Sequence, residues 1–293
     1  MEICTDMGGH DSAILLISCP DARGLVAGVS GFLYEHGANI LSTDEHRDDA
    51  TGQFLMRVEW DLDGFALDRD GFAAAFEAAV ARRFHMDWRV AYSRDRLGVA
   101  IFVSRYLHCL ADLLHRRHMG ELPGEIRLII SNHEDAAALA GFYGVPFVHT
   151  PVSPGTRAAA ERRQLELLEE HGIGLVVLAR YMQILSPEFV GRYPAQIINV
   201  HHSFLPAFQG ARPYHAAFER GVKLIGATAH YVTEALDDGP IIEQEVVRVS
   251  HRDQLEDLIE KGRDAERLAL ARAVRWHLEH RILLYGRKTV VFT

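Results

Sequence analysis

Cysteine is scarce in this chain and follows no pattern. The three cysteines among the 293 residues are Cys4, Cys19 and Cys109, and no two of them have the CxxC spacing. Disulfide frameworks use an even number of cysteines, and structural zinc sites use closely spaced pairs. The sequence therefore predicts reduced thiols, which are typical of a cytoplasmic protein.

Long apolar runs and a surplus of positive charge are absent as well. The chain has 31 Lys and Arg against 40 Asp and Glu, a net charge of −9. That balance disfavours nucleic acid as a partner, because phosphate backbones bind through clustered cations. No apolar run reaches the length of a membrane span, and the first residues show no basic segment followed by an apolar one. We therefore expect no membrane partner, no signal peptide and a cytoplasmic location.

The chain does have enough apolar sequence for two packed cores. Hydrophobic residues make up 48% and charged residues 24% of the chain, as in globular proteins. A short charged segment, Ser93 to Gly98, separates two regions with different patterns. We predict one domain over residues 1–94 and a second over residues 95–293.

The first region has the strand and helix order βαββαβ. Short apolar or alternating stretches indicate strands, and apolar residues at helical spacing indicate helices. The predicted strands cover residues 13–18, 39–43, 53–60 and 86–91, and the predicted helices cover residues 25–36 and 72–84. This order is that of a ferredoxin-like α/β sandwich.

The first region also resembles the ACT domain family over residues 10–92. The resemblance rests on Asp21-Ala-Arg-Gly24 at the first turn and on Gly37-Ala-Asn39 after the first helix. ACT domains commonly bind amino acids at interfaces between paired copies. The resemblance therefore implies an amino-acid effector, with Asn39 as a contact, and a homo-oligomer. As an alternative, Asn39 is a polar turn residue after the glycine that ends the helix.

In the second region strands and helices alternate. The predicted strands cover residues 99–103, 126–131, 147–149, 175–179, 197–201, 224–232 and 241–249, and the predicted helices cover residues 106–117, 135–143, 156–171 and 254–281. This alternation predicts a Rossmann-like, mostly parallel open sheet with helices on both faces. Such folds bind ligands at the carboxyl ends of their strands. The fold class of the whole chain is therefore α/β.

Three polar residues carry the candidate chemistry. Asn199 and His201 lie two residues apart at the end of one predicted strand, so their side chains point to the same face. Asp237 lies in the turn-prone segment Asp237-Asp-Gly-Pro240, downstream of His230. A carboxamide, an imidazole and a carboxylate can polarise a carbonyl group, hold its oxyanion and move a proton without a metal. We predict Asn199, His201 and Asp237 as catalytic residues and His230 as a substrate contact.

Each of these residues also has an ordinary structural interpretation. A lone Asn or His in a strand is usually a hydrogen-bonded core residue, and Asp-Asp-Gly often forms only a turn. The histidines His201, His202, His215 and His230 raise the alternative of a zinc site. They do not follow HExxH or a related spacing, so we predict no metal.

A loop after the predicted strand at 175–179 offers apolar surface with backbone donors and acceptors. It comprises Met182, Gln183, Ile184 and Leu185. Such a surface suits a flat heteroaromatic ring and makes all four candidate substrate contacts, although the pattern alone favours a structural role. The alternative is an ordinary helix start, with Ser186 as the N-cap and Pro187 at the first helical position.

Residues 174–249 closely resemble the folate-dependent formyltransferase and deformylase superfamily. The matching residues are Leu178, Ala179, Tyr181, Met182, Ile184–Pro187, Asn199–His201, Leu205, Pro206, Gly210, His230 and Asp237–Ile242. The string His201–His215 resembles the formyltetrahydrofolate deformylases specifically, and an ACT-like domain in front fits that family too. The resemblance implies that Asn199, His201 and Asp237 are catalytic. It also implies that the 182–185 loop and the loop before Asp237 hold the pterin ring.

Departures from the superfamily favour hydrolysis over transfer. Glycinamide ribonucleotide formyltransferases begin this domain with a glycine- and serine-rich phosphate loop, whereas Val103–Leu110 of this chain has no glycine. A backbone cradle for an acceptor phosphate is therefore not expected. Gln183 stands where some relatives have arginine, a second departure.

The resemblance implies hydrolysis of 10-formyltetrahydrofolate to tetrahydrofolate and formate, with folate as the substrate and no cofactor. In that reaction Asp237 activates water, Asn199 and His201 hold the oxyanion, and the formate serves one-carbon metabolism and purine synthesis. Two alternatives stay open. One is a transferase that formylates an amine such as glycinamide ribonucleotide. The other is a non-catalytic amino-acid sensor whose second domain only binds folate.

Overall fold

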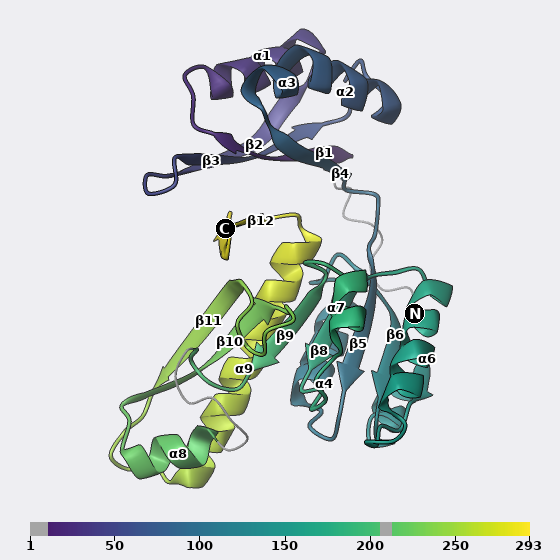
Figure 1. Ribbon diagram of the computed structural model, residues 1–293, viewed down its shortest axis with the longest axis vertical. Helices are drawn as coiled ribbons and strands as arrows, with labels where there is room; N and C mark the ends of the chain where they lie inside the picture. The colour runs from purple at the N-terminus through teal and green to yellow at the C-terminus, as the bar shows by residue number, and fades with distance from the viewer. Residues whose placement is uncertain (1–10, 206–212) are drawn as a thin grey trace. The chain divides into compact units, whose positions relative to one another are not determined.

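The computed structural model describes residues 11–205 and 213–293, in two compact units that are treated separately (Figure 1). The first unit comprises the chain up to Asp95 with His280–Gly286 and Val290–Thr293, and the second comprises Arg96–Glu279 and Arg287–Thr289. The C-terminal residues of the first unit belong to the region that the sequence assigned to the second domain. Pro206 and Gly210, on which part of the family resemblance rests, lie outside the described residues.

The first unit is an antiparallel sheet in the order β2-β3-β1-β4, with its helices on one face (Figure 1). Its strands are β1 (Ser12–Pro20), β2 (Asn39–Asp48), β3 (Gln53–Asp61) and β4 (Asp87–Tyr92). Its helical segments are α1 (Leu25–Glu35), α2 (Arg69–Phe76), the π-helical turn η1 (Glu77–Ala81) and α3 (Arg82–Phe84). The predicted βαββαβ order is confirmed.

Strand β1 is apolar at nearly every position because both of its faces are covered. Leu15 and Ile17 join a core with Phe72 of the helical layer. Leu16, which points to the opposite face, joins a separate cluster with Leu283 and Phe292 from the C-terminal segment. A strand buried on both sides loses the alternation of polar and apolar residues that marks a half-exposed strand.

The C-terminal segment forms a hairpin of β12 (Ile282–Tyr285) and β13 (Lys288–Val291). The sequence predicted a helix up to residue 281, but α9 ends at Leu278. The reason is His280, whose φ of 52° lies in the left-handed region and cannot continue a right-handed helix. The buried Arg57 of β3 donates to the His280 carbonyl (3.2 Å), which helps to hold this bend.

The second unit has a seven-stranded sheet in the order β11-β10-β9-β8-β5-β6-β7. Its strands are β5 (Gly98–Val103), β6 (Glu125–Ser131), β7 (Phe147–His149), β8 (Ile173–Ala179), β9 (Ile197–His201), β10 (Leu224–Tyr231) and β11 (Ile241–Arg248). Strands β5 to β9 are parallel, and β10 and β11 pair antiparallel. The predicted Rossmann-like sheet is confirmed, and its strand order reverses between β5 and β8.

Helices cover both faces of this sheet (Figure 1). Leu113 of α4 and Val274 of α9 meet Ile101 on one face, while Leu167 of α6 and Phe189 of α7 belong to the core on the other. The helices are α4 (His108–His118), α5 (Ala137–Phe142), α6 (Arg157–Glu170), α7 (Pro187–Arg192), α8 (Pro213–Arg220) and α9 (Leu255–Leu278). No helix in the described parts of the chain is long and apolar enough to span a membrane.

Candidate active site

Strands β9 and β10 bring two predicted site residues together. His230 lies opposite Asn199 in the antiparallel ladder, and the Asn199 amide donates to His230 Nε2 (3.2 Å). His230 Nδ1 lies 2.9 Å from the Tyr231 carbonyl oxygen. Because a carbonyl only accepts, Nδ1 carries the proton and Nε2 is the acceptor, so His230 is neutral. Burial is the largest effect on the pKa of His230 and lowers it, which favours the same state.

This hydrogen bond orients Asn199. A carboxamide nitrogen carries two N–H groups, and His230 takes one of them. The second N–H points away from that bond and can donate to a ligand. Asn199 is only partly buried, so a carbonyl oxygen can reach it. The strand ladder thus supplies a preoriented donor for an oxyanion.

Asp237 reaches the same place from the loop between β10 and β11. Its Oδ2 lies 3.2 Å from His201 Nδ1, and its Oδ1 lies 3.8 Å from His230 Nε2. The contact with His201 is the largest effect on the pKa of Asp237 and holds it below the ordinary 3.8, although burial opposes it. Asp237 is therefore an anion at neutral pH. The structure brings Asn199, His201 and Asp237 together, with His230 beside them.

The Asp237 loop is packed tightly against β10. Asp237 has a φ of 52°, and the Tyr231 N–H donates to the Pro240 carbonyl (2.9 Å). A Cβ atom added at Gly239 would lie 1.7 Å from the Tyr231 carbonyl oxygen. Only glycine allows this approach of two backbone segments. The segment Asp237-Asp-Gly-Pro240 is therefore a turn that also fixes the position of a carboxylate.

A cavity of about 420 Å³ lies beside Asp237. Its lining includes Leu205, Ile241 and the hairpin residues Arg287–Thr289. Arg287 Nη2 pairs with Asp238 Oδ2 at 2.5 Å, and Thr289 Oγ1 donates to the Ile241 carbonyl at 2.5 Å. The tip of the hairpin thus contacts the Asp237 loop at Asp238 and at Ile241. We call these two contacts the brace of the Asp237 loop. This contact could not be predicted, because nothing in the sequence of the C-terminal segment indicates a partner 49 residues earlier.

The 182–185 loop presents only part of its predicted surface. Met182 and Ile184 are 49% and 58% exposed, and Gln183 is partly exposed. Leu185 is buried in the core, so it can meet a ligand only through its backbone. The Met182 N–H donates to Ser104 Oγ (3.1 Å), which anchors the loop to the end of β5. Two exposed apolar side chains on an anchored loop fit the predicted contact with a flat ring.

Asn39, the predicted effector contact, belongs to the first unit. It is the first residue of β2 and lies opposite Asp61 of β3. Its side chain is exposed, which leaves the amide accessible to a ligand. Its role in binding an effector stays a prediction.

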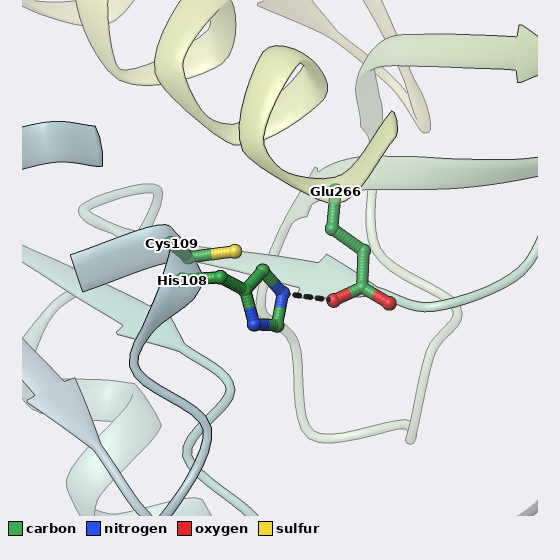
Figure 2. A group of neighbouring side chains, drawn as sticks. All are labelled: His108, Cys109 and Glu266. Carbon is green, nitrogen blue, oxygen red and sulfur yellow. Dashed lines mark hydrogen bonds and ion pairs between the residues drawn. The ribbon is translucent and has the colours of Figure 1, made fainter. Parts of the chain in front are cut away.

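Figure 2 shows a further buried group in the second unit, formed by His108 and Cys109 of α4 and Glu266 of α9. Their potential ligand atoms all lie within 4.8 Å of one another. His108 Nε2 lies 2.7 Å from Glu266, and Tyr214 Oη donates to Glu266 at 2.8 Å. The sequence reasoning missed this group, because His108 and Glu266 are 158 residues apart.

Charge argues against a cation in this group. Burial, followed by the nearby Glu266 carboxylate, raises the pKa of Cys109 well above its usual value, so the thiol is neutral in this group. The Arg180 guanidinium, with Nε 3.5 Å from Glu266 Oε2, already supplies the compensating positive charge. None of the histidines considered for a zinc site belongs to the group. The predicted absence of a metal stays a prediction.

Comparison with known proteins places this geometry in a family. The formyl transferase family model matches residues 97–274, and the ACT domain model matches residues 13–80. The chain is 53% identical to the formyltetrahydrofolate deformylase of Synechocystis sp. over 281 residues, 96% of this chain and 98% of that protein. A crystal structure of a formyltetrahydrofolate deformylase from Pseudomonas syringae pv. tomato matches with a TM-score of 0.94 and 49% identity, over 98% of this chain and 96% of that one.

The transferases are more distant. The crystal structure of glycinamide ribonucleotide transformylase 1 from Symbiobacterium toebii matches with a TM-score of 0.64 and 32% identity, over 69% of this chain and 97% of that one. That match spans only part of this chain, whereas the deformylases match nearly all of it at higher identity. The chain therefore belongs to the formyltetrahydrofolate deformylase family, with an ACT domain followed by a formyl transferase domain.

Proposed function

We propose that this protein hydrolyses 10-formyltetrahydrofolate to tetrahydrofolate and formate. The observation that carries the proposal is the convergence of Asn199, His201 and Asp237 at the carboxyl end of β9. The relatives that match nearly the whole chain are named for this substrate and this reaction. Hydrolysis of an amide needs a nucleophilic water, an oxyanion site and a proton donor, and no cofactor is required for it.

The nucleophile is a water held by Asp237. The carboxylate is anionic, partly exposed and fixed by its loop. It accepts a hydrogen bond from the water and takes its proton as the water oxygen attacks the formyl carbon. A carboxylate with a depressed pKa is a weak base, so its main contribution is to orient the water against that carbon.

The oxyanion is held by Asn199 and His201. The second N–H of Asn199 donates from one side. His201 Nδ1 faces Asp237, while its Nε2 is buried and has no hydrogen-bond partner in the described structure. In its protonated form His201 donates Nδ1–H to Asp237 and leaves Nε2–H for the oxyanion. Both donors then stabilise the charge that develops only in the transition state.

Collapse of the tetrahedral intermediate completes the reaction. The bond between the formyl carbon and N10 breaks, and N10 takes a proton from His201 or from the protonated Asp237. One water is consumed, and formate and tetrahydrofolate are the products. Met182 and Ile184 provide the apolar contact for the pterin ring, with Gln183, the Leu185 backbone and His230 around it.

The second candidate function is transfer of the formyl group to an amine, since the fold also matches a glycinamide ribonucleotide transformylase. Product analysis separates the two functions. The protein is incubated with 10-formyltetrahydrofolate, with and without glycinamide ribonucleotide. Hydrolysis predicts the same formate yield in both and no formylated amine. Formylated glycinamide ribonucleotide in place of formate would replace the proposal with transfer.

The first unit supports regulation of this activity by an amino acid. The ACT domain match and the exposed Asn39 support an amino-acid effector bound between paired copies of the chain. The buried free cysteines Cys19 and Cys109 support a reducing, cytoplasmic location, where the formate would supply one-carbon metabolism and purine synthesis. Sedimentation of the protein, with each amino acid in turn, tests the oligomer and the effector. A monomer that binds none of them would contradict this part.

Arg287→Ala should lower the turnover of 10-formyltetrahydrofolate by about tenfold, because loosening the Asp237 loop misplaces the water by a fraction of an ångström. The brace is lost with the contacts from Arg287 to the Asp238 carboxylate and carbonyl. Arg163→Ala, which removes only surface pairs on α6, is the matched control and should leave turnover unchanged. Equal rates for the two variants would show that the hairpin tip has no role in positioning.

A further inference from the structure

The strand order of the second unit reverses between β5 and β8, and the carboxyl ends of these strands define a crevice. Open α/β sheets bind their ligands in such a crevice. In this protein, side chains that closely follow β5 and β8 lie there with the buried Tyr214 of α8 and Glu266 of α9. We call them the Glu266 cluster, and its members are Tyr106, His108, Arg180, Tyr214 and Glu266.

The cluster is held together by Glu266, which is 1% exposed. It accepts hydrogen bonds from His108 Nε2 (2.7 Å) and Tyr214 Oη (2.8 Å), and Arg180 Nε lies 3.5 Å away. The Arg180 guanidinium also lies 5.3 Å from the centre of the Tyr106 ring. A buried carboxylate is held in place by its hydrogen bonds and by the opposite charge of Arg180, because a buried charge without such partners is costly. We refer to this set of mutually contacting side chains as the plug, and Figure 2 shows two of its members, His108 and Glu266.

Tyr214, a bulky and buried member of the plug, packs against the backbone of α9. A Cβ atom added at Gly262 of α9 would lie 2.2 Å from Tyr214 Cζ. The ring thus rests directly on the helix backbone, at the point where α9 has no side chain. Because Gly262 has no side chain, α9 leaves just enough space at this point for the Tyr214 ring.

Ring contacts connect the plug to the catalytic residues. The centre of the Tyr214 ring lies 6.3 Å from that of His202, and the His202 ring lies 5.1 Å from that of His201. His202 is buried, and burial is the main reason that its pKa falls to about 4, so the ring is neutral. Side chains therefore extend from Glu266 to the oxyanion site through Tyr214 and His202.

We propose that the Glu266 cluster determines the acceptor of the formyl group, by filling the volume in which a second substrate with an amine would have to lie. This inference rests on the proposed hydrolysis. In transfer, the amine nitrogen must approach the formyl carbon to about 3 to 3.5 Å. It forms the new C–N bond and loses a proton, while the bond from the formyl carbon to N10 breaks and N10 takes up a proton. In hydrolysis the water oxygen does the same and needs no further space. His108, Tyr214 and Glu266 are thus specificity residues, because the volume that they occupy is closed to a second substrate.

The test is the partition of the formyl group between water and a small primary amine. Glycinamide at a fixed excess is incubated with the full-length protein and 10-formyltetrahydrofolate, and formylglycinamide and formate are both quantified. The wild type should give mostly formate, with a low but measurable yield of formylglycinamide. Tyr214→Ala and His108→Ala, singly and together, open the plug and should raise the ratio of formylglycinamide to formate at least tenfold. Tyr214→Phe keeps the ring and loses the hydroxyl, so its ratio should equal that of the wild type.

Two results would overturn the inference. One is a wild type that formylates glycinamide as readily as the opened variants. The other is the same ratio for Tyr214→Ala and Tyr214→Phe, which would rule out volume as the cause. If Tyr214→Ala does not fold, His108→Ala decides, with His108→Gln as its size-matched control. A wild type that releases no formate at all contradicts the proposed function instead, so the two failures are distinguishable.

Discussion

Asp237→Asn should reduce the turnover of 10-formyltetrahydrofolate by about 1000-fold. The amide keeps the size of the carboxylate but cannot take a proton from water, and it no longer carries the charge that faces His201. Asp238→Asn is the matched control, because it makes the same change one residue further along and touches only the brace to Arg287. Its loss should not exceed about tenfold. Initial rates of formate release measure both, and similar rates for the two variants would remove Asp237 from the mechanism.

The pH profile should follow from the same contact. The pKa of Asp237 lies below its usual value, chiefly because of His201. A depressed carboxyl pKa means that the anion persists as the pH falls through the ordinary aspartate range and is lost only below it. The acid limb due to Asp237 should therefore lie below that range. His201→Gln removes the main cause and should move the limb of the residual activity to higher pH. A wild-type limb at the ordinary aspartate value would contradict this electrostatic account.

Asn199→Ala should lower kcat by about 100- to 1000-fold and change KM little. Removing one oxyanion donor has an effect of this size, and the donor acts mainly on charge that appears in the transition state. Asn199 is suited to this role because His230 fixes its amide. Gln196→Ala is the control, since it removes an exposed carboxamide three residues earlier. Near-normal turnover of Asn199→Ala would refute the assigned oxyanion site.

The grouping of Asn199, His201 and Asp237 could be predicted from sequence because the signals were local or carried by family resemblance. The two-residue spacing of Asn199 and His201 is enough to put both side chains on one face of a strand. Asp237 lies in the connection between β10 and β11, and the antiparallel pairing of β10 with β9 sets His230 opposite Asn199, so that this connection begins beside β9. Gly239 could be recognised only as a turn residue. Its contact with the Tyr231 carbonyl requires the folded backbone.

The supporting residues could not be predicted, because each acts across a long separation in sequence. Glu266 looks like one of many polar residues on an amphipathic helix, and only the packing of α9 against α4 buries it with His108. Arg287 follows a helix whose end was predicted three residues too late, so its hairpin was not recognised. Leu185 has the composition of a ligand surface, yet its side chain faces the core. Residue type and spacing do not determine these orientations.

The most direct test of the account is formate release from 10-formyltetrahydrofolate alone, with no amine acceptor and with excess chelator. We expect formate and tetrahydrofolate in equal amounts over many turnovers, at a rate that the chelator does not change. Activity that appears only when an amine is added would establish a transferase. No turnover under either condition would establish a protein that binds folate without acting on it, and either result would contradict the catalytic role of Asn199, His201 and Asp237 in hydrolysis.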